Sequence, residues 1–164
     1  MELYILRHGL AEERSHSGRD RDRALTPEGI ERTHSAGKAL RKMDVEFDLV
    51  LSSPFVRAWQ TAEIIVQELD CANKLQKCEP LSSGGPMEEV LEALKKIEGS
   101  YQSVLLVGHE PDLSQLLSVL LSGSLDVAIT MKKGGLAKLT CMTADPSSAR
   151  LEWLLTPKHL CRLD

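Results

Sequence analysis

Short apolar runs alternate with segments of helical periodicity along most of this 164-residue chain. The runs at 2–6, 48–52 and 103–107 have the composition of strands that are buried on both faces. Each is followed, directly or after a loop, by a stretch whose apolar residues recur every three or four positions, which predicts a helix. Parallel strands need such crossover helices, so the alternation predicts a three-layer α/β/α sandwich around a mostly parallel central sheet.

Local signals predict where several of these elements begin and end. The Thr-Pro pair at 26–27 predicts a helix that is capped by the threonine and runs to about Lys42. The Ser-Pro pair at 53–54 predicts a second helix start of the same kind. Three further elements are expected: a helix over 86–98, a helix after Gly108 and a short strand over 78–81.

The last third of the chain has a different pattern. Residues 137–141 and 151–155 alternate apolar and polar side chains, and the turn-rich stretch 143–148 separates them. This pattern predicts an antiparallel pair that closes the sheet and gives it an antiparallel edge strand. No repeat or linker interrupts the chain, so residues 1–164 are expected to form one domain.

Composition narrows the classes of function. A net charge of −4, a pI near 5.8 and only 4% aromatic residues argue against a nucleic-acid-binding protein. None of the four cysteines forms a C-x-x-C pair, so free thiols in a reducing compartment are expected. Neither a signal peptide nor a membrane-spanning run is recognisable, and the prediction is a cytoplasmic protein without membrane association.

Polar side chains follow three of the predicted parallel strands. Arg7 and His8 follow the first strand, Ser53 and Arg57 follow the second, and His109 follows the strand at 103–107. The carboxyl ends of parallel strands meet at one edge of a sheet, where ligands of open α/β folds bind. The sequence therefore predicts that two histidines and two arginines share one site.

Such a cluster suits a phosphoryl group. Guanidinium groups match phosphate oxygens, and Arg23 in the first loop offers a third one. Ser53 and the amides of the helix behind it would add to the anion site. Neighbouring cations lower the pKa of His8, which predicts a neutral imidazole able to attack phosphorus, while Arg7, Arg57 and His109 stabilise the charge. Zinc is disfavoured because the arginines repel a cation, and neither a metal nor another cofactor is expected.

Three motifs together resemble the histidine phosphatase (phosphoglycerate mutase-like) superfamily. They are RHG at 7–9, SSPFVRAWQTA at 52–62 and GHEP at 108–111, in the order and spacing of that family. The resemblance implies a phosphoglycerate mutase-like fold and a phosphohistidine intermediate on His8. It also implies that Arg7, Arg57 and His109 form the phosphate pocket.

The short chain, DRALTPEGI at 22–30 and KKGGLAKL at 132–139 are similar to SixA-type phosphohistidine phosphatases. This similarity adds Arg23 to the phosphate pocket. Mutases and sugar-phosphate phosphatases of the superfamily usually carry a longer insertion that roofs the site and a glutamate before the third helix. Here the equivalent segment is Leu81–Pro86, which has no carboxylate.

The proton donor stays open. Glu88 and Glu89 are expected inside a helix, and four acidic residues of the first loop remain as candidates: Glu12, Glu13, Asp20 and Asp22. An alkoxide leaving group needs a placed acid, whereas a phosphorylated imidazole leaves once solvent protonates its ring. The missing acid and roof therefore favour phosphohistidine on a signalling or phosphotransfer protein as the substrate.

Two rival hypotheses remain from the sequence. One is a small-molecule phosphatase or mutase of the same superfamily, and the other is a non-catalytic module that binds phosphoproteins. Lys132 and Lys133 either face an acidic partner or form a solvated pair. His16, His34 and His159 belong to no motif and are interpreted as structural.

Overall fold

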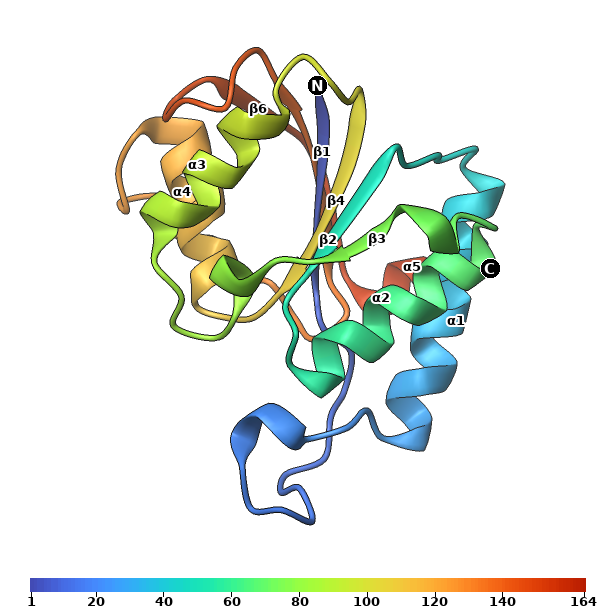
Figure 1. Ribbon diagram of the computed structural model, residues 1–164. Coiled ribbons are helices and arrows are strands. Elements are labelled where there is room, and N and C mark those ends of the chain that lie inside the picture. Colours follow the sequence, from blue (N-terminus) through green and yellow to red (C-terminus); the bar gives the residue numbers. More distant parts are fainter.

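The computed structural model describes residues 1–164 and confirms the three-layer α/β/α architecture (Figure 1). The six strands are β1 (Glu2–Arg7), β2 (Leu49–Ser52), β3 (Leu75–Lys77), β4 (Ser103–Gly108), β5 (Leu136–Cys141) and β6 (Ala149–Leu155). The five helices are α1 (Pro27–Lys42), α2 (Val56–Glu68), α3 (Met87–Ile97), α4 (Asp112–Ser122) and α5 (Pro157–Leu163). None of these helices is both long and apolar enough to cross a membrane.

All six strands form one sheet in the order β3-β2-β4-β1-β5-β6. The first four pair in parallel, whereas β5 is antiparallel to both β1 and β6. The predicted antiparallel pair is therefore present, with β6 at the edge. The carboxyl ends of β1, β2 and β4 consequently lie side by side, at the lower edge of the sheet in Figure 1.

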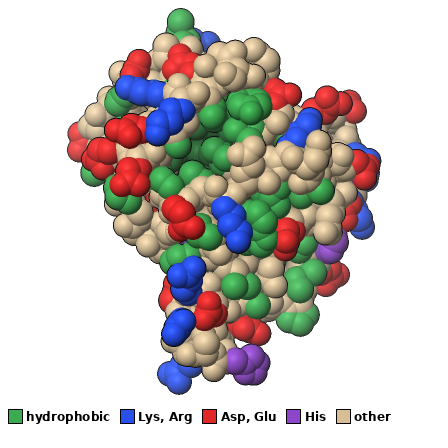
Figure 2. Space-filling model, viewed as in Figure 1, with side chains coloured by type: hydrophobic (Ala, Val, Ile, Leu, Met, Phe, Trp, Pro, Cys, Tyr) green, Lys and Arg blue, Asp and Glu red, His purple; other side chains and the backbone are tan.

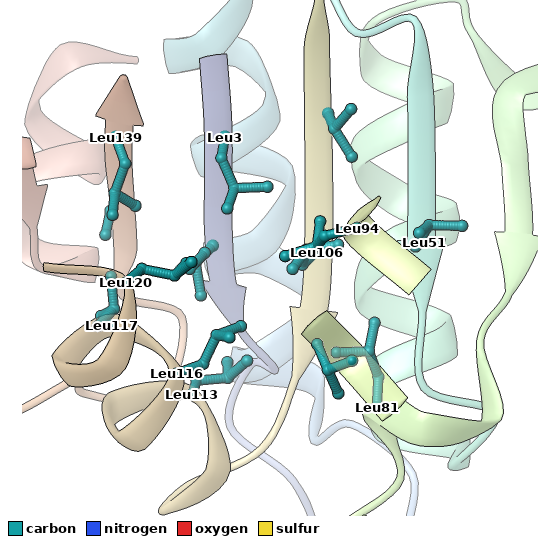
Figure 3. Close-up of a cluster of buried hydrophobic side chains, with 14 of the residues drawn as sticks. Leu3, Leu51, Leu81, Leu94, Leu106, Leu113, Leu116, Leu117, Leu120 and Leu139 are labelled. Atoms are coloured by element: carbon teal, nitrogen blue, oxygen red, sulfur yellow. The ribbon is translucent and has the colours of Figure 1, made fainter. Parts of the chain in front are cut away.

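Alternate side chains of each strand pack into two separate cores. Leu3 and Ile5 of β1 join the cluster beneath α3 and α4, which Figure 3 shows as interlocked leucines from strands and helices. Tyr4 and Leu6 point to the other face, where α1, α2 and α5 cover them. Burial on both faces explains why β1 is apolar at every position from 3 to 6 rather than alternating.

Three local predictions need correction or addition. The strand is at Leu75–Lys77 rather than at 78–81, because Pro80 lacks an N–H and the chain there forms a 3-10 turn over Glu79–Leu81. Helix α2 begins at Val56, so the Ser-Pro pair precedes it and the serine is no cap. Helix α5 was not expected, since seven residues show no clear periodicity. Its start repeats the Thr-Pro signal of α1, with His159 in the capping box of Thr156.

The first turn of α1 lies against the loop that follows β1. Thr26 caps the helix by accepting a hydrogen bond from the Gly29 N–H at 3.0 Å, as the sequence predicts. A Cβ at position 29 would overlap the carbonyl oxygen of Leu10. Gly29 therefore permits the close approach that brings this loop to the sheet edge.

We expect Gly29→Ala to lower the free energy of unfolding by about 3 kcal/mol, because backbone must move to admit the methyl group. Urea denaturation measures the change. Glu31→Ala, an exposed position on the same helix, serves as the control and should stay within about 0.5 kcal/mol of the wild type. Equal stability of the two variants would show that the approach at Leu10 is not tightly packed.

The four cysteines are free, as predicted; Cys71, Cys78 and Cys141 are buried and Cys161 is exposed. Burial raises the pKa of the Cys141 thiol to about 11, so this thiol is protonated at neutral pH.

Candidate active site

The polar residues predicted to meet do lie together at the carboxyl edge of the sheet. Arg7 ends β1 directly beside Gly108 at the end of β4, and the His8 N–H donates to the Gly108 carbonyl at 3.0 Å. The ring centroids of His8 and His109 are 5.1 Å apart. His8, Arg57 and His109 are only 5%, 4% and 2% exposed, although each carries a polar side chain. The edge is therefore a buried polar cluster.

Two hydrogen bonds of opposite sense fix the tautomer of His8. Its Nδ1 lies 2.8 Å from the carbonyl oxygen of Gly9, which can only accept, so Nδ1 carries the proton. The Nε of Arg57 donates to Nε2 of His8 at 3.3 Å, and a guanidinium can only donate. The lone pair of His8 is thus on Nε2, the nitrogen that faces the arginine.

Burial keeps the imidazole of His8 neutral. The pKa of His8 is lowered to about 4, first by desolvation and then by the charges of Arg57, Arg7 and Lys133, while the hydrogen bond to Gly9 acts in the opposite direction. The direction agrees with the prediction, but desolvation outweighs the neighbouring cations that the prediction invoked. The result is an uncharged nitrogen nucleophile beside fixed positive charges.

His109 is held by Ser53. Its Nε2 lies 2.8 Å from the Ser53 hydroxyl, whose oxygen also accepts a bond from the Phe55 N–H at 3.2 Å. Ser53 thus orients the imidazole, and its part in anion binding stays a prediction. Desolvation, followed by the charges of His8 and Arg57, lowers the pKa of His109 to about 3. Its buried Nδ1 has no hydrogen-bond partner in the protein.

Arg7 lies close enough to both histidines for its charge to lower their pKa values. One terminal nitrogen of Arg7 donates to the carbonyl of Met131 at 2.7 Å, and its buried Nε has no partner. Desolvation lowers the pKa of Arg7 itself. Together with Nδ1 of His109, this Nε is one of two site atoms that are buried without a partner, and such atoms favour a bound polar group.

The carboxylate of Asp20 accepts hydrogen bonds from two arginines of the cluster, Arg57 and Arg23. Arg57 donates to the Asp20 carbonyl at 2.7 Å and to its Oδ2 at 2.9 Å, while Arg23 donates to Oδ1 at 2.7 Å. The bonds to Arg23 and Arg57 hold the pKa of Asp20 below its usual value. Arg23 therefore reaches the cluster through Asp20, and an ionised Asp20 is an anion in the pocket rather than a proton donor.

The other candidate acids do not touch the cluster through their carboxylates. Glu12 contributes only its carbonyl, which accepts from Arg23, and the carboxylate of Asp22 accepts from Ser17. Glu88 and Glu89 are exposed in the first turn of α3, as expected. Asp20 lies on a loop that projects beyond the sheet edge and carries positive and negative side chains together (Figures 1 and 2).

Sequence reasoning missed one supporting side chain. The Thr61 hydroxyl accepts from the Gly9 N–H at 3.0 Å and donates to the Arg57 carbonyl at 2.7 Å, which ties the turn after β1 to α2. Its position four residues after Arg57 is the only signal for it, because that spacing places both on one side of the helix. The structure holds no group of three or more His, Cys, Asp or Glu side chains arranged for a metal ion.

Comparisons with known proteins show the family of the chain. The family model of the histidine phosphatase superfamily (branch 1) matches residues 3–82, which include Arg7, His8 and Arg57. Phosphohistidine phosphatase SixA of Escherichia coli (strain K12) is 30% identical over 164 residues, covering 98% of this chain and 96% of that protein. The chain belongs to the histidine phosphatase superfamily.

Within this superfamily the chain is SixA-like over its whole length. The structure of the protein histidine phosphatase SixA complexed with tungstate superposes with a TM-score of 0.84 at 27% identity, covering 100% of both chains. An uncharacterized protein of Picosynechococcus sp. is 34% identical over 140 residues, 85% of this chain and 84% of that protein. The phosphoglycerate mutase-like fold and membership among the phosphatases of the superfamily follow from these matches.

Proposed function

We propose that this histidine phosphatase hydrolyses phosphohistidine on a signalling or phosphotransfer protein, in the cytoplasm, through a covalent phosphohistidine on its own His8. The observation that carries the proposal is the state of His8, which is buried and neutral and presents the Nε2 lone pair beside Arg57. The similarity to a phosphohistidine phosphatase over nearly the whole chain supports the choice of substrate.

The reaction has two displacements at phosphorus. In the first, Nε2 of His8 forms a bond to phosphorus while the bond from phosphorus to the substrate imidazole breaks, and that leaving nitrogen takes a proton from solvent. In the second, water attacks phosphorus, releases inorganic phosphate and returns the electron pair to Nε2. The proton stays on Nδ1 throughout, held by its hydrogen bond to the Gly9 carbonyl, so that the lone pair remains on Nε2.

The cations bind the phosphoryl oxygens. Arg57 and Arg7 offer guanidinium donors to the equatorial oxygens, where charge gathers in the transition state. Nε of Arg7 and Nδ1 of His109 have no hydrogen-bond partner in the protein and can bond these oxygens. An incoming dianion displaces the Asp20 carboxylate from Arg57 and Arg23. The negative charge of the dianion also favours protonation of His109, which then donates a hydrogen bond to the phosphoryl group.

The leaving-group side favours phosphohistidine over a phosphate ester. The pKa of Asp20 is lowered by Arg23 and Arg57, which keeps its carboxylate ionised and unsuited to donate a proton. A protonated imidazole leaves without a placed acid, whereas an alkoxide does not.

The substrate class is tested by comparing kcat/KM for a phosphohistidine protein with kcat/KM for sugar phosphates. We expect a clear preference for the phosphohistidine protein. A preference for sugar phosphates would assign the chain to the small-molecule phosphatases or mutases of the superfamily. Phosphate binding without hydrolysis of either substrate would indicate a binding module.

The protonation state of His8 is measurable in the free enzyme. Because its pKa is lowered to about 4, its imidazole should remain neutral, with the proton on Nδ1, from pH 8 down to about pH 5. Nitrogen NMR of the His8 imidazole follows this titration directly. Titration of His8 near 6.5, or a proton on Nε2, would contradict the proposed nucleophile.

Asp20→Asn tests whether the carboxylate competes with the phosphoryl group. Removing its charge should tighten the binding of tungstate about tenfold, the effect of one charge-assisted hydrogen bond. Calorimetric titration gives the dissociation constant. Asp22→Asn lies in the same turn but bonds Ser17 rather than an arginine, so it should leave tungstate affinity unchanged. Weaker binding by Asp20→Asn would show that Asp20 organises the pocket instead.

A further inference from the structure

An open groove with a volume of about 530 Å³ lies beside α5 and is lined by four cationic side chains: Arg32, Lys132, Lys158 and Arg162. None of its lining residues is a carboxylate. Arg32 is paired with Glu28, whereas the two lysines and Arg162 form no ion pair with any carboxylate in the protein. We call this feature the basic groove. A protein of net charge −4 thus concentrates uncompensated positive charge in one place.

The fold places the basic groove at the same sheet edge as the candidate active site. Strand β6 runs in the direction of β1, so Lys158, which follows it, emerges at the carboxyl edge. Strand β5 runs the other way, so Lys132, which precedes it, emerges there too. Helix α1 also starts at this edge, where the Thr26 N–H donates to the Leu10 carbonyl at 2.9 Å, and it carries Arg32.

The segment 132–134 connects the basic groove to His8, because Lys132 lines the groove and Gly134 contacts the backbone of His8. The N–H of Gly134 bonds the carbonyls of Arg7 at 3.1 Å and of His8 at 2.9 Å. Pro157, which lines the groove, would lie 3.6 Å from a Cβ built on Gly134. The charge of Lys133 also contributes to lowering the pKa of His8. A ligand that contacts Lys132 in the groove therefore lies two residues along the chain from Gly134, whose N–H bonds the His8 carbonyl.

We propose that the basic groove docks an acidic segment of the substrate protein, next to the histidine that carries the phosphoryl group. This inference rests on the proposed function and adds a charge preference to it. A compact acidic segment fits, because the groove offers a few clustered cations, whereas the net negative charge of the chain repels a long polyanion such as nucleic acid. Exposed charges at the edge of a binding surface raise the association rate of an oppositely charged partner and discriminate against a like-charged one.

Two phosphohistidine peptides of equal length test the docking, one with flanking glutamates and one with flanking lysines. The wild type should hydrolyse the glutamate peptide with a kcat/KM about tenfold higher at low salt, and added salt should reduce the difference. Lys132→Glu/Lys158→Glu should reverse the preference toward the lysine peptide. Its activity on free phosphohistidine should stay at the wild-type level, which reports an intact site.

Lys42→Glu/Lys96→Glu is the matched control. Both lysines are exposed, form no ion pair, and lie in the last turns of α1 and α3. It should keep the wild-type preference. Equal hydrolysis of both peptides by the wild type, or an unchanged preference in Lys132→Glu/Lys158→Glu, overturns the docking while the proposed function stands. Binding of wild-type protein and of Lys132→Glu/Lys158→Glu to duplex DNA is measured as well. If the wild type binds DNA, the variant does not, and the peptide preference is unchanged, the groove binds nucleic acid and the docking proposal is overturned. Failure to hydrolyse any phosphohistidine substrate refutes the proposed function itself.

Discussion

His8→Ala should lower kcat for phosphohistidine hydrolysis by a factor on the order of 10⁴ or more, because it removes the neutral imidazole whose Nε2 is the proposed nucleophile. His109 is the neighbouring imidazole, but its Nε2 is engaged with Ser53 and its Nδ1 is the atom proposed to donate to the phosphoryl oxygens. Tungstate should still bind, since the arginines that hold an anion remain. Steady-state kinetics and calorimetric titration measure the two quantities on the same preparation.

The control for this variant is His16→Ala, on the exposed part of the loop after β1, which should keep wild-type activity. If His8→Ala retained hydrolysis within tenfold of the wild type, another group would be the nucleophile. Loss of both hydrolysis and tungstate binding would instead indicate that the alanine had disrupted the site.

Arg57→Ala should lower kcat/KM by about 10³-fold, the effect of removing a guanidinium from a phosphoryl-transfer site. All three of its nitrogens point into the cluster, one to His8 and two to Asp20, and the side chain is almost fully buried. Arg57→Lys should recover little of this loss, because an ammonium group is a compact point charge and lacks the planar fork of donors that a guanidinium presents.

The matched control is Arg41→Lys, an exposed arginine at the far end of α1 that pairs with Asp70. Its kcat/KM should equal that of the wild type. Comparable activity of Arg57→Lys and Arg41→Lys would mean that only positive charge, and not the fork of donors, matters at position 57.

The site could be predicted from sequence wherever residues follow parallel strands. Arg7, His8, Arg57 and His109 are separated by up to about a hundred positions, yet the topology of an α/β sheet brings their strand ends together. Apolar periodicity predicted helices α1 to α4, since each must bury one apolar face. The strand-end rule did not predict that Ser53 contacts His109, because it locates a residue at the edge without fixing the partner of its side chain.

Contacts made by the long loop after β1 were beyond prediction. Four acidic residues of this loop were equivalent candidates, and only the folded loop shows that Asp20 meets Arg57 and Arg23. Loop conformation depends on several weak contacts rather than on a hydrophobic period. The short strand β3 was predicted at the wrong residues and the seven-residue α5 was missed for a related reason, because few residues carry too little pattern to define an element.

Capture of the phosphoryl group on the enzyme tests nucleophilic attack by His8 directly. The wild type is mixed with a phosphohistidine substrate, quenched in alkali, in which phosphohistidine persists, and digested for mass spectrometry. We predict one added phosphoryl group on the peptide that contains His8, and none on that peptide from His8→Ala. Turnover without any labelled enzyme peptide, or a label on a different residue, would contradict nucleophilic attack by His8.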